Sequence, residues 1–277
     1  MKTLKTVLMA TALLAVGFAG RAVLHTKRGG EPWRAGLSGN GFAVVELFTS
    51  EGCSSCPPAD ALIAQVQQED KNLPVYILAF HVDYWDRLGW KDAFSDVAYS
   101  DRQRRYSAWL NLSSIYTPEV VVNGRQEFVG SESGALHEAI QSGLDQQGDV
   151  QLTLSGLKRD GGRLDWQCRA EGVGARAHVS VVVALVERSA VTKVRAGENS
   201  GRTLSHVQVV RQFVMASLDG KGNSAGKLDW PAGIAPGEGE VIAFLQDQDN
   251  GKIIAATRSQ PGQSFAVVTR SGEGNRP

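Results

Sequence analysis

The sequence predicts an α/β domain in its first half, followed by a β-sandwich-like domain. Two observations carry this prediction. From residue 42 to about residue 148, short apolar runs alternate with longer stretches of helical spacing. Beyond that point, short runs of alternating apolar and polar residues follow one another without a convincing helix, and Gly, Asp and Asn separate them. Many short strands divided by turns are typical of a sandwich.

Length and charge agree with two globular domains. The chain has 277 residues, and a domain takes roughly 150 residues. Lys and Arg total 29, as do Asp and Glu, so the formal net charge is zero. This balance gives no electrostatic reason to expect a nucleic acid or an anionic membrane as partner.

Residues 1–20 have the pattern of an export signal. Lys2 and Lys5 precede an apolar run at 7–16, and small residues at 17–19 offer a cleavage site. The apolar stretch is shorter than the ~20 residues that span a bilayer. We therefore expect an exported protein, periplasmic or extracellular, which meets the membrane only if this segment stays uncleaved.

A linker is expected at residues 21–41, and the first domain at 42–148. Its short apolar runs predict strands at 43–48, 74–80, 119–122 and 127–129. Helical spacing, or proline in a first turn, predicts helices at 57–68, 90–110 and 133–146. Asn123-Gly124 is a strong signal for a two-residue hairpin turn between the last two strands.

The second domain is expected at residues 149–277. Its β-type runs lie at 150–154, 164–170, 179–186, 241–245, 252–257 and 264–269. Cys168 shares parity with Leu164 and Trp166, so it is expected to point into the core as a small apolar residue. His178 and His206 are isolated, and each is expected to be a polar surface or core residue.

The chemistry-bearing motif is Cys53-Ser54-Ser55-Cys56, which directly follows the first strand. Two cysteines at this spacing can close and reopen a disulfide, and the N-terminus of the following helix stabilises a thiolate. In an α/β setting, this unit indicates a redox site. A zinc site of four ligands usually needs a second cysteine pair, whereas the chain has three cysteines in all. We therefore expect neither a metal nor a cofactor.

Residues 44–130 closely resemble a secreted thioredoxin-like family of uncharacterised function. The resemblance rests mainly on the segment Leu47–Asp60, with its Cys-Ser-Ser-Cys-Pro-Pro-Ala-Asp signature. Further segments that contribute to it are His81–Asp86, Arg102-Gln103, Tyr116-Thr117-Pro118 and, further on, Glu198–His206. The resemblance implies a thioredoxin-like domain with a helical insertion at about 81–114, followed by the β-type region.

The resemblance also assigns roles to two residues outside the cysteine motif. It implies that Pro118 follows a cis peptide bond and lies beside the cysteines; the alternative is a proline that starts an edge strand. It implies that Glu46 is a buried acid that accepts the proton of the second thiol. The alternative for Glu46 is a solvated strand end, because a carboxylate in an apolar strand is unfavourable unless paired or functional.

The expected function is thiol–disulfide exchange, which would make the protein a thiol–disulfide oxidoreductase acting on protein or small-molecule thiols and disulfides. By resemblance, Cys53 is the exposed thiol that attacks and Cys56 the one that resolves. A helix that starts at Pro57 would leave Cys56 nearest the helix dipole and puts this order in question. Two alternatives stay open: a non-catalytic binding module with a structural disulfide, and a soft-metal (copper) carrier.

Overall fold

The first strand, β1, spans Ala43–Thr49, and every one of its residues is buried. It pairs in parallel with β2, Val75–His81, and antiparallel with β3, Glu119–Val122. A strand covered on both faces is a continuous apolar run, which is the pattern that predicted β1. The structure is a computed structural model, and it describes residues 41–174, 178–235, 237–259 and 266–267.

The hairpin expected at Asn123-Gly124 is present. It joins β3 to β4, Gln126–Val129, and both turn residues have positive φ, 50° for Asn123 and 66° for Gly124. Val122 pairs with Gln126, so the connection has three residues, 123–125, one more than the two-residue turn that was expected. The Asn123 side chain also accepts a hydrogen bond from the amide of Val44 at 2.7 Å, which fixes the hairpin to β1.

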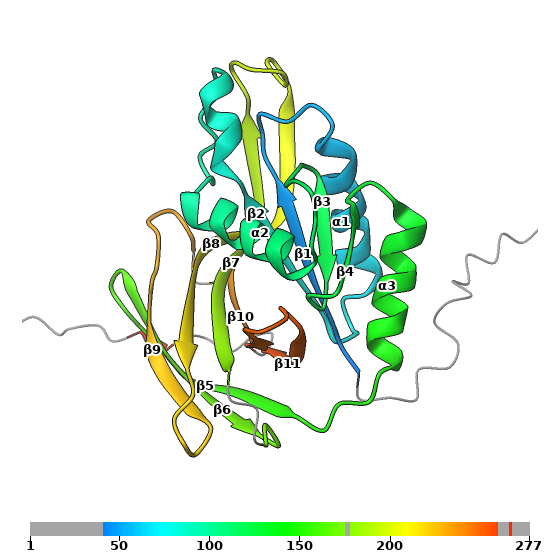
Figure 1. Cartoon of the computed structure of the whole chain (residues 1–277). Helices are drawn as coiled ribbons and strands as arrows, with labels where there is room; N and C mark the ends of the chain where they lie inside the picture. The colour runs from blue at the N-terminus through cyan, green and yellow to red at the C-terminus, as the bar shows by residue number, and fades with distance from the viewer. Residues whose placement is uncertain (1–40, 175–177, 236, 260–265, 268–277) are drawn as a thin grey trace, which may run out of the picture. The chain divides into compact units, whose positions relative to one another are not determined.

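The large sheet continues through strands from the second half of the chain. Its order is β11-β10-β7-β8-β2-β1-β3-β4 (Figure 1). The additional strands are β7 Val179–Lys193, β8 Thr203–Ser217, β10 Gly239–Asp247 and β11 Ile253–Arg258. Strand β8 joins β2 in parallel, with Ala79 opposite Val209. Residue 148, the expected domain boundary, is therefore not a boundary between sheets.

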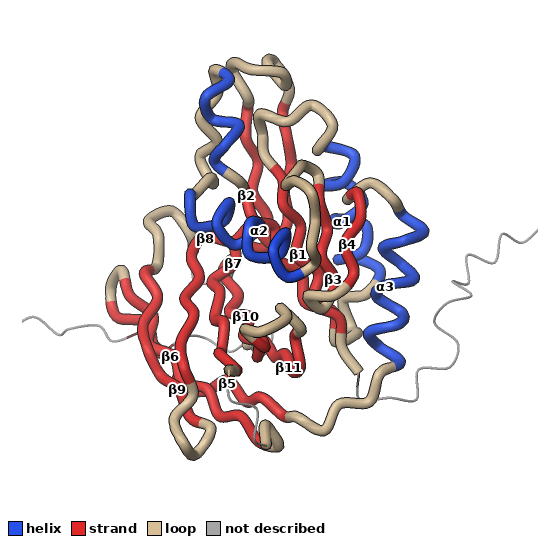
Figure 2. Tube along the Cα trace, in the orientation of Figure 1, coloured by secondary structure: helices blue, strands red, loops and turns tan. Residues whose placement is uncertain are grey.

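A second, four-stranded sheet has the order β12-β5-β6-β9. Its strands are β5 Gln151–Asp160, β6 Arg163–Glu171, β9 Asn223–Asp229 and β12 Ala266–Val267. From β5 onward, the elements of the described chain are all strands (Figure 2). Leu164, Trp166 and Cys168 of β6 share a core with Val183 and Leu185 of β7, as the alternation of β6 predicts.

Three helices cover the part of the large sheet around β1. Helices α1, Pro57–Glu69, and α3, Ser133–Asp145, share a core with Val45 and Leu47. Helix α2, Val97–Trp109, shares a core with the residues of opposite parity, Val44 and Phe48. Alternate residues of a strand point to opposite faces, so α2 lies on the face opposite α1 and α3.

The prediction of a helix at 90–110 is wrong about where the helix begins. Residues Asp83–Leu88 form a short 3₁₀ helix, η2, and α2 begins only at Val97. Asp96 caps α2, since its carboxylate accepts a hydrogen bond from the amide of Ala98 at 2.8 Å. Strands β8 and β9 were not expected at all.

The chain is thus a mixed α/β protein with one large mixed sheet and a second, smaller sheet. The expected export signal and the linker, apart from residue 41, lie outside the described residues. In the described part of the chain, no helix is both long and apolar enough to cross a membrane.

A chain ended after residue 148 is expected to lose its cooperative unfolding transition. The truncation leaves the edge of β2 without β8, and it removes Val182, Ala184 and Phe244 from the core beneath α2. Thermal unfolding followed by circular dichroism checks this, with a chain ended after residue 259 as control. A sharp transition in the shorter chain would show that its first half folds independently.

Candidate functional site

The cysteines form a disulfide in the loop between β1 and α1. Cys53 is linked to Cys56, and Cys56 is the N-cap residue of α1. The helix cannot begin earlier, because Pro57 and Pro58 have no amide hydrogen to bond the carbonyls of preceding residues. The first helical bonds instead run from the amides of Ala59 and Asp60 to the carbonyl of Cys56, at 2.9 and 3.1 Å. Cys56 is therefore the cysteine at the helix N-terminus.

Both cysteines are fully buried, with 0% of their surface exposed. The expectation that Cys53 is exposed is wrong, since only the intervening Ser54 and Ser55 reach solvent. The Ser55 hydroxyl lies 3.4 Å from the Cys53 sulfur, within hydrogen-bond reach.

The cover over the disulfide loop comes from the second half of the chain. We call residues 194–202 the β7–β8 loop. In this loop Glu198 accepts a hydrogen bond from the amide of Ser54 at 3.0 Å. Asn199, fully buried, donates to the carbonyls of Glu51 and Cys53, at 2.9 Å each. Three hydrogen bonds thus hold the β7–β8 loop against the cysteine motif.

Arg202 supports this arrangement, because its guanidinium donates to the Asn199 side-chain oxygen at 2.7 Å. The hydrogen bonds from Ser54 lower the pKa of Glu198, which keeps that carboxylate charged. The segment Glu198–His206, which contributes to the family resemblance, therefore contacts the cysteine motif through Glu198 and Asn199.

Pro118 lies in a loop that also approaches the cysteine motif. The Thr117–Pro118 peptide bond is cis. Trp85 of η2 connects this loop to the disulfide loop. Its indole nitrogen donates to the Thr117 hydroxyl at 2.8 Å, and a Cβ placed at Gly52 would lie 3.1 Å from the Trp85 Cβ. Burial raises the pKa of the neighbouring Glu119 to about 7, against the hydrogen bond from Gln103.

Glu46 is buried, as the resemblance implies, but its carboxylate has partners other than the thiols. It is fully buried, which excludes a solvated strand end. Its carboxylate accepts hydrogen bonds from Arg102 and from the Tyr106 hydroxyl, both on α2. By strand parity Glu46 points to the α2 face, whereas Cys56 begins α1 on the other face. Glu46 is therefore the partner of a buried arginine rather than a neighbour of the thiols.

The Arg102 guanidinium has further partners that stabilise its charge. Its carbon lies 5.1–5.7 Å from the ring centroids of Phe80, Tyr106, Phe213 and Phe244. Burial opposes the charge, but Glu46 outweighs it and raises the pKa of Arg102 above its usual range. This buried ion pair links β1, α2 and β10, since Arg102 also donates to Gln246 at 3.3 Å.

A second buried group of titratable side chains lies on the α1 side and was not expected from the sequence. We call it the acid–histidine cluster; its members are Glu51, Asp60, His81, Asp92 and His206. Thr49 and His81 end the parallel strands β1 and β2 as register partners. The carboxyl ends of such strands are where α/β proteins build sites.

Within the cluster, Asp60 and His206 bring α1 and β8 together. The Asp60 carboxylate accepts a hydrogen bond from the Thr49 hydroxyl at 3.1 Å, and its other oxygen lies 3.8 Å from His206 Nδ1. On its other side, His206 Nε2 lies 3.5 Å from Glu51 Oε1. His206 is therefore placed between two carboxylates, one on each side of the cysteine motif.

His81 and Asp92 complete the cluster. His81 Nδ1 lies 2.6 Å from Asp92 Oδ2, and the rings of His81 and His206 meet edge to face with centroids 4.8 Å apart. Burial disfavours the charge on His81, but Asp92, Asp60 and Glu51 outweigh it and raise its pKa. Burial raises the pKa of Asp60, although both histidines oppose the shift. For Asp92, His81 overcomes burial and lowers the pKa.

Sequence signals for this cluster are partial. Asp60 follows Cys56 by four residues, a spacing that puts two side chains on the same helix face. His206 ends the segment Glu198–His206 that contributes to the resemblance, but its place beside Asp60 was not predictable, because β8 was not expected. Within the described part of the chain, no three His, Cys, Asp or Glu side chains are placed to hold a metal ion.

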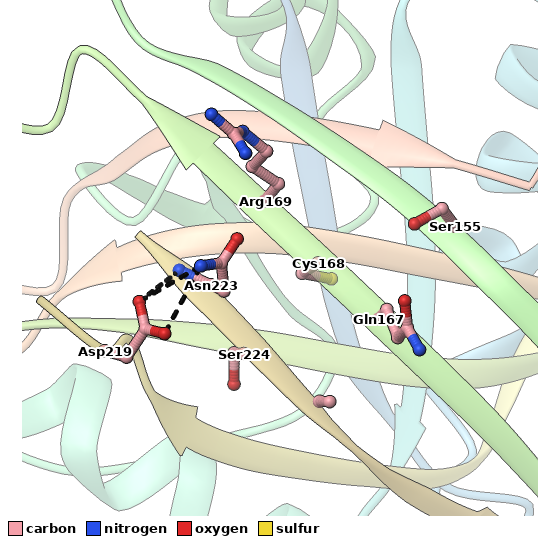
Figure 3. Close-up of a pocket in the computed structure, with 8 residues that line it drawn as sticks. Ser155, Gln167, Cys168, Arg169, Asp219, Asn223 and Ser224 are labelled. Atoms are coloured by element: carbon pink, nitrogen blue, oxygen red, sulfur yellow. Dashed lines mark hydrogen bonds between the residues drawn. The ribbon is translucent and has the colours of Figure 1, made fainter. Parts of the chain in front are cut away.

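A cavity of about 510 Å³ lies on the four-stranded sheet (Figure 3), away from the disulfide. Ser155, Gln167, Arg169, Asp219 and Asn223 contribute to its lining. The Asp219 carboxylate already accepts a hydrogen bond from the backbone amide of Asn223 at 2.8 Å. None of the residues around the disulfide lines this cavity.

A protein-family model matches most of the described chain. The model described as "Protein of unknown function (DUF1223)" matches residues 44–246, more than half of the chain. The chain belongs to the DUF1223 family. The disulfide, Pro118, the β7–β8 loop and the acid–histidine cluster all lie within the matched residues.

Two solved structures were also found to be similar to this DUF1223 chain. A protein from Agrobacterium tumefaciens, solved by the Northeast Structural Genomics Consortium, is 26% identical with a TM-score of 0.60, over 80% of this chain and 95% of its own. A domain of the outer membrane lipoprotein Omp28 from Porphyromonas gingivalis has 11% identity and a TM-score of 0.25, over 44% of this chain and 100% of that one. The latter score is too low to bear on the fold. No curated protein matches the chain.

Replacing Arg102 by Met is expected to destabilise the protein by about 3–5 kcal/mol, because it leaves the Glu46 carboxylate buried without its charge partner. Arg104→Met on the same helix is the control. Arg104 forms an exposed pair with Asp101, and such pairs contribute about 1 kcal/mol or less. Urea unfolding of the oxidised proteins measures both. Equal effects would show that the Glu46–Arg102 pair is not a structural requirement.

Replacing Glu198 by Ala is expected to speed reduction of the Cys53–Cys56 disulfide by dithiothreitol several-fold. The β7–β8 loop then loses its bond to the Ser54 amide and uncovers the sulfurs more often. Alkylation of samples quenched over time measures the rate. Glu171→Ala, an exposed glutamate on β6, is the control, and no acceleration in Glu198→Ala would mean that the loop does not limit access.

Proposed function

We propose that this protein carries out thiol–disulfide exchange through Cys53 and Cys56 on a thioredoxin-like domain. The proposal rests on the disulfide between Cys53, in the loop that follows β1, and Cys56, the N-cap residue of α1. The N-terminus of a helix favours negative charge, so a thiolate at Cys56 is stabilised there. A good leaving thiolate makes the disulfide easier to open.

The proposed step begins with a thiolate of the partner. It attacks the Cys53 sulfur, a Cys53–partner disulfide forms, and the Cys53–Cys56 bond breaks. The electron pair stays on Cys56, the sulfur at the helix N-terminus. In reverse, the Cys56 thiolate attacks Cys53 and releases the partner. The Ser55 hydroxyl, within reach of the Cys53 sulfur, can donate to it when it is a thiolate.

The thioredoxin-like part of the proposal rests on three features around the disulfide. Strand β1 pairs with β2 in parallel and with β3 antiparallel. A cis proline, Pro118, opens β3, and Trp85 joins its loop to the cysteine motif. We assign Pro118 the role of presenting backbone groups to the partner chain. Glu46 is not included in the reaction, since Arg102 and Tyr106 occupy its carboxylate.

A second candidate function is a binding module in which the disulfide is structural. The complete burial of both sulfurs favours it, because exchange needs an accessible sulfur. Opening of the β7–β8 loop distinguishes the two functions. Exchange requires that the loop move from Ser54, whereas a structural disulfide is protected by a loop that stays closed.

We further propose that the protein works outside the cytoplasm, where the export-type N-terminus would deliver it and where disulfides persist. Its partners are then thiols or disulfides of exported proteins or small molecules. Mass measurement of the mature protein from cell fractions tests both delivery and cleavage. An intact N-terminus on a cytoplasmic protein contradicts the proposal.

Titration against glutathione tests exchange directly. The Cys53–Cys56 couple is expected to equilibrate with the reduced and oxidised pool, as followed by alkylation of the quenched protein. A potential below about −300 mV identifies a structural disulfide instead. Tight binding of copper(I) by the reduced protein, without exchange, would favour the soft-metal carrier.

Cysteine variants test the order of the thiols. Cys56→Ser is expected to accumulate mixed disulfides on Cys53, because no second thiol resolves them, while Cys53→Ser accumulates few. Cys168→Ser is the control, since Cys168 is a free thiol buried in a separate core. Non-reducing gels and mass spectrometry measure the adducts. Accumulation on Cys56 instead would reverse the two roles.

A further inference from the structure

Several buried polar atoms of the acid–histidine cluster have no hydrogen bond. They are Glu51 Oε1, His81 Nε2 and both ring nitrogens of His206. The two His206 nitrogens face carboxylate oxygens of Glu51 and Asp60 at 3.5 and 3.8 Å, which is ion-pair distance without a hydrogen bond. Buried polar groups are normally satisfied, and one left unpaired costs about 1–3 kcal/mol. A cluster retained at such a cost is a candidate for chemistry.

The cluster adjoins Cys56 through α1. Asp60 lies one helical turn after Cys56, and its amide donates to the Cys56 carbonyl at 3.1 Å. Side chains four residues apart on a helix are neighbours, with about 5–6 Å between their Cβ atoms. Because side chains on a helix lean toward its N-terminus, the Asp60 carboxyl leans toward Cys56. His206 approaches the same carboxyl from β8, at 3.8 Å.

We propose that Asp60 and His206 form the proton-transfer pair for Cys56, with Asp60 as the group that exchanges the proton and His206 as its positioning residue. This inference rests on the proposed thiol–disulfide exchange. When a partner thiolate attacks Cys53, the Cys53–Cys56 bond breaks and the electron pair passes to the Cys56 sulfur. The proton held by Asp60 then moves onto that sulfur. In the resolving direction, Cys56 returns the proton to Asp60 as its sulfur attacks Cys53.

The surroundings favour a proton on this pair. The charged and titratable groups that face it are Glu51 from the disulfide loop, His81 from β2 and Asp92 from the segment after η2. Three carboxylates therefore share two imidazoles in a buried space, and burial holds the pKa of Asp60 above its ordinary value. The Arg211 guanidinium, which lies 5.1 Å from the ring centroid of Phe94, is paired with Glu187.

Asp60 can also regain its proton from solvent. Asp60 is 8% exposed and His206 only 3%, so a proton can pass between solvent and the cluster at Asp60. Glu46, which the resemblance assigned to this task, lies on the other face of β1 and is occupied by Arg102. The acid for Cys56 thus comes from α1, and its support comes from the second half of the chain.

The test measures reduction of the disulfide in the full chain by dithiothreitol, from mildly acidic to mildly alkaline pH, with each rate divided by the concentration of reductant thiolate. In the wild type this corrected rate is expected to be highest at low pH and to fall as pH rises, because the pair loses its proton. Asp60→Asn and His206→Gln are expected to be slower at low pH, roughly tenfold to a hundredfold, and to lose the pH dependence. His178→Gln, an exposed histidine paired with Asp249, is the control.

Variants that are folded by near-ultraviolet circular dichroism and keep the wild-type pH profile would overturn the inference while exchange itself stands. A wild-type disulfide that no thiol reduces would overturn the proposed function as well. A measurement on the wild type alone guards against misfolded variants. Carboxyl-detected NMR is expected to show the Asp60 carboxyl titrating at different pH in the oxidised and reduced proteins, and an identical titration in both states contradicts the proposal.

Discussion

The parallel pairing of β2 with β8 is the constraint on which the candidate site depends. Through it, the second half of the chain becomes part of the same sheet as β1, with Ala79 opposite Val209. Strand β8 then carries His206 to the start of α1, and the loop before it carries Glu198 and Asn199 to the cysteine motif. Without this pairing the disulfide would have neither its cover nor its buried histidine.

Two buried charged groups flank β1, and they differ in how well they are satisfied. On the α2 face, the Glu46–Arg102 pair has hydrogen-bond partners from Tyr106 and Gln246. On the α1 face, both ring nitrogens of His206 face carboxylates but form no hydrogen bond. A fully satisfied polar network stabilises one arrangement, whereas incomplete satisfaction is expected where a protein keeps groups for chemistry. The contrast assigns structure to one face and reactivity to the other.

Much of the first half of the fold could be predicted from the sequence. The strands around β1, the start of α1 at Pro57 and the Asn123-Gly124 turn follow from apolar runs, from proline and from turn chemistry. Strand β8 could not, because a bulge interrupts its alternation. The register with β7 shifts beside Leu185 and Val186, and Gln208 has a φ of 52°. Apolar and polar residues change faces there, which hides the period of two.

The candidate site was predictable to the extent that it is local. Cys53 and Cys56 are only three positions apart in sequence. Pro118 is marked by the segment Tyr116-Thr117-Pro118, which contributes to the resemblance. The burial of Cys53 was not predictable, because its cover is supplied by residues about 145 positions later. For the same reason a lone His206 gave no sign of its partners: Asp60 and Glu51 meet it only through the sheet.

Two tryptophans lie beside the disulfide loop, so their fluorescence can report on changes at the disulfide. Trp90 donates to the Glu51 carboxylate at 2.8 Å, and Trp85 lies against Gly52, so two indoles flank the residues that lead into Cys53. Trp109, Trp166 and Trp230 are buried or partly buried in other parts of the structure. Intrinsic fluorescence should therefore respond to events at the sulfurs without any attached dye. The difference between the wild type and a variant with Trp85 or Trp90 replaced by phenylalanine gives the contribution of that indole.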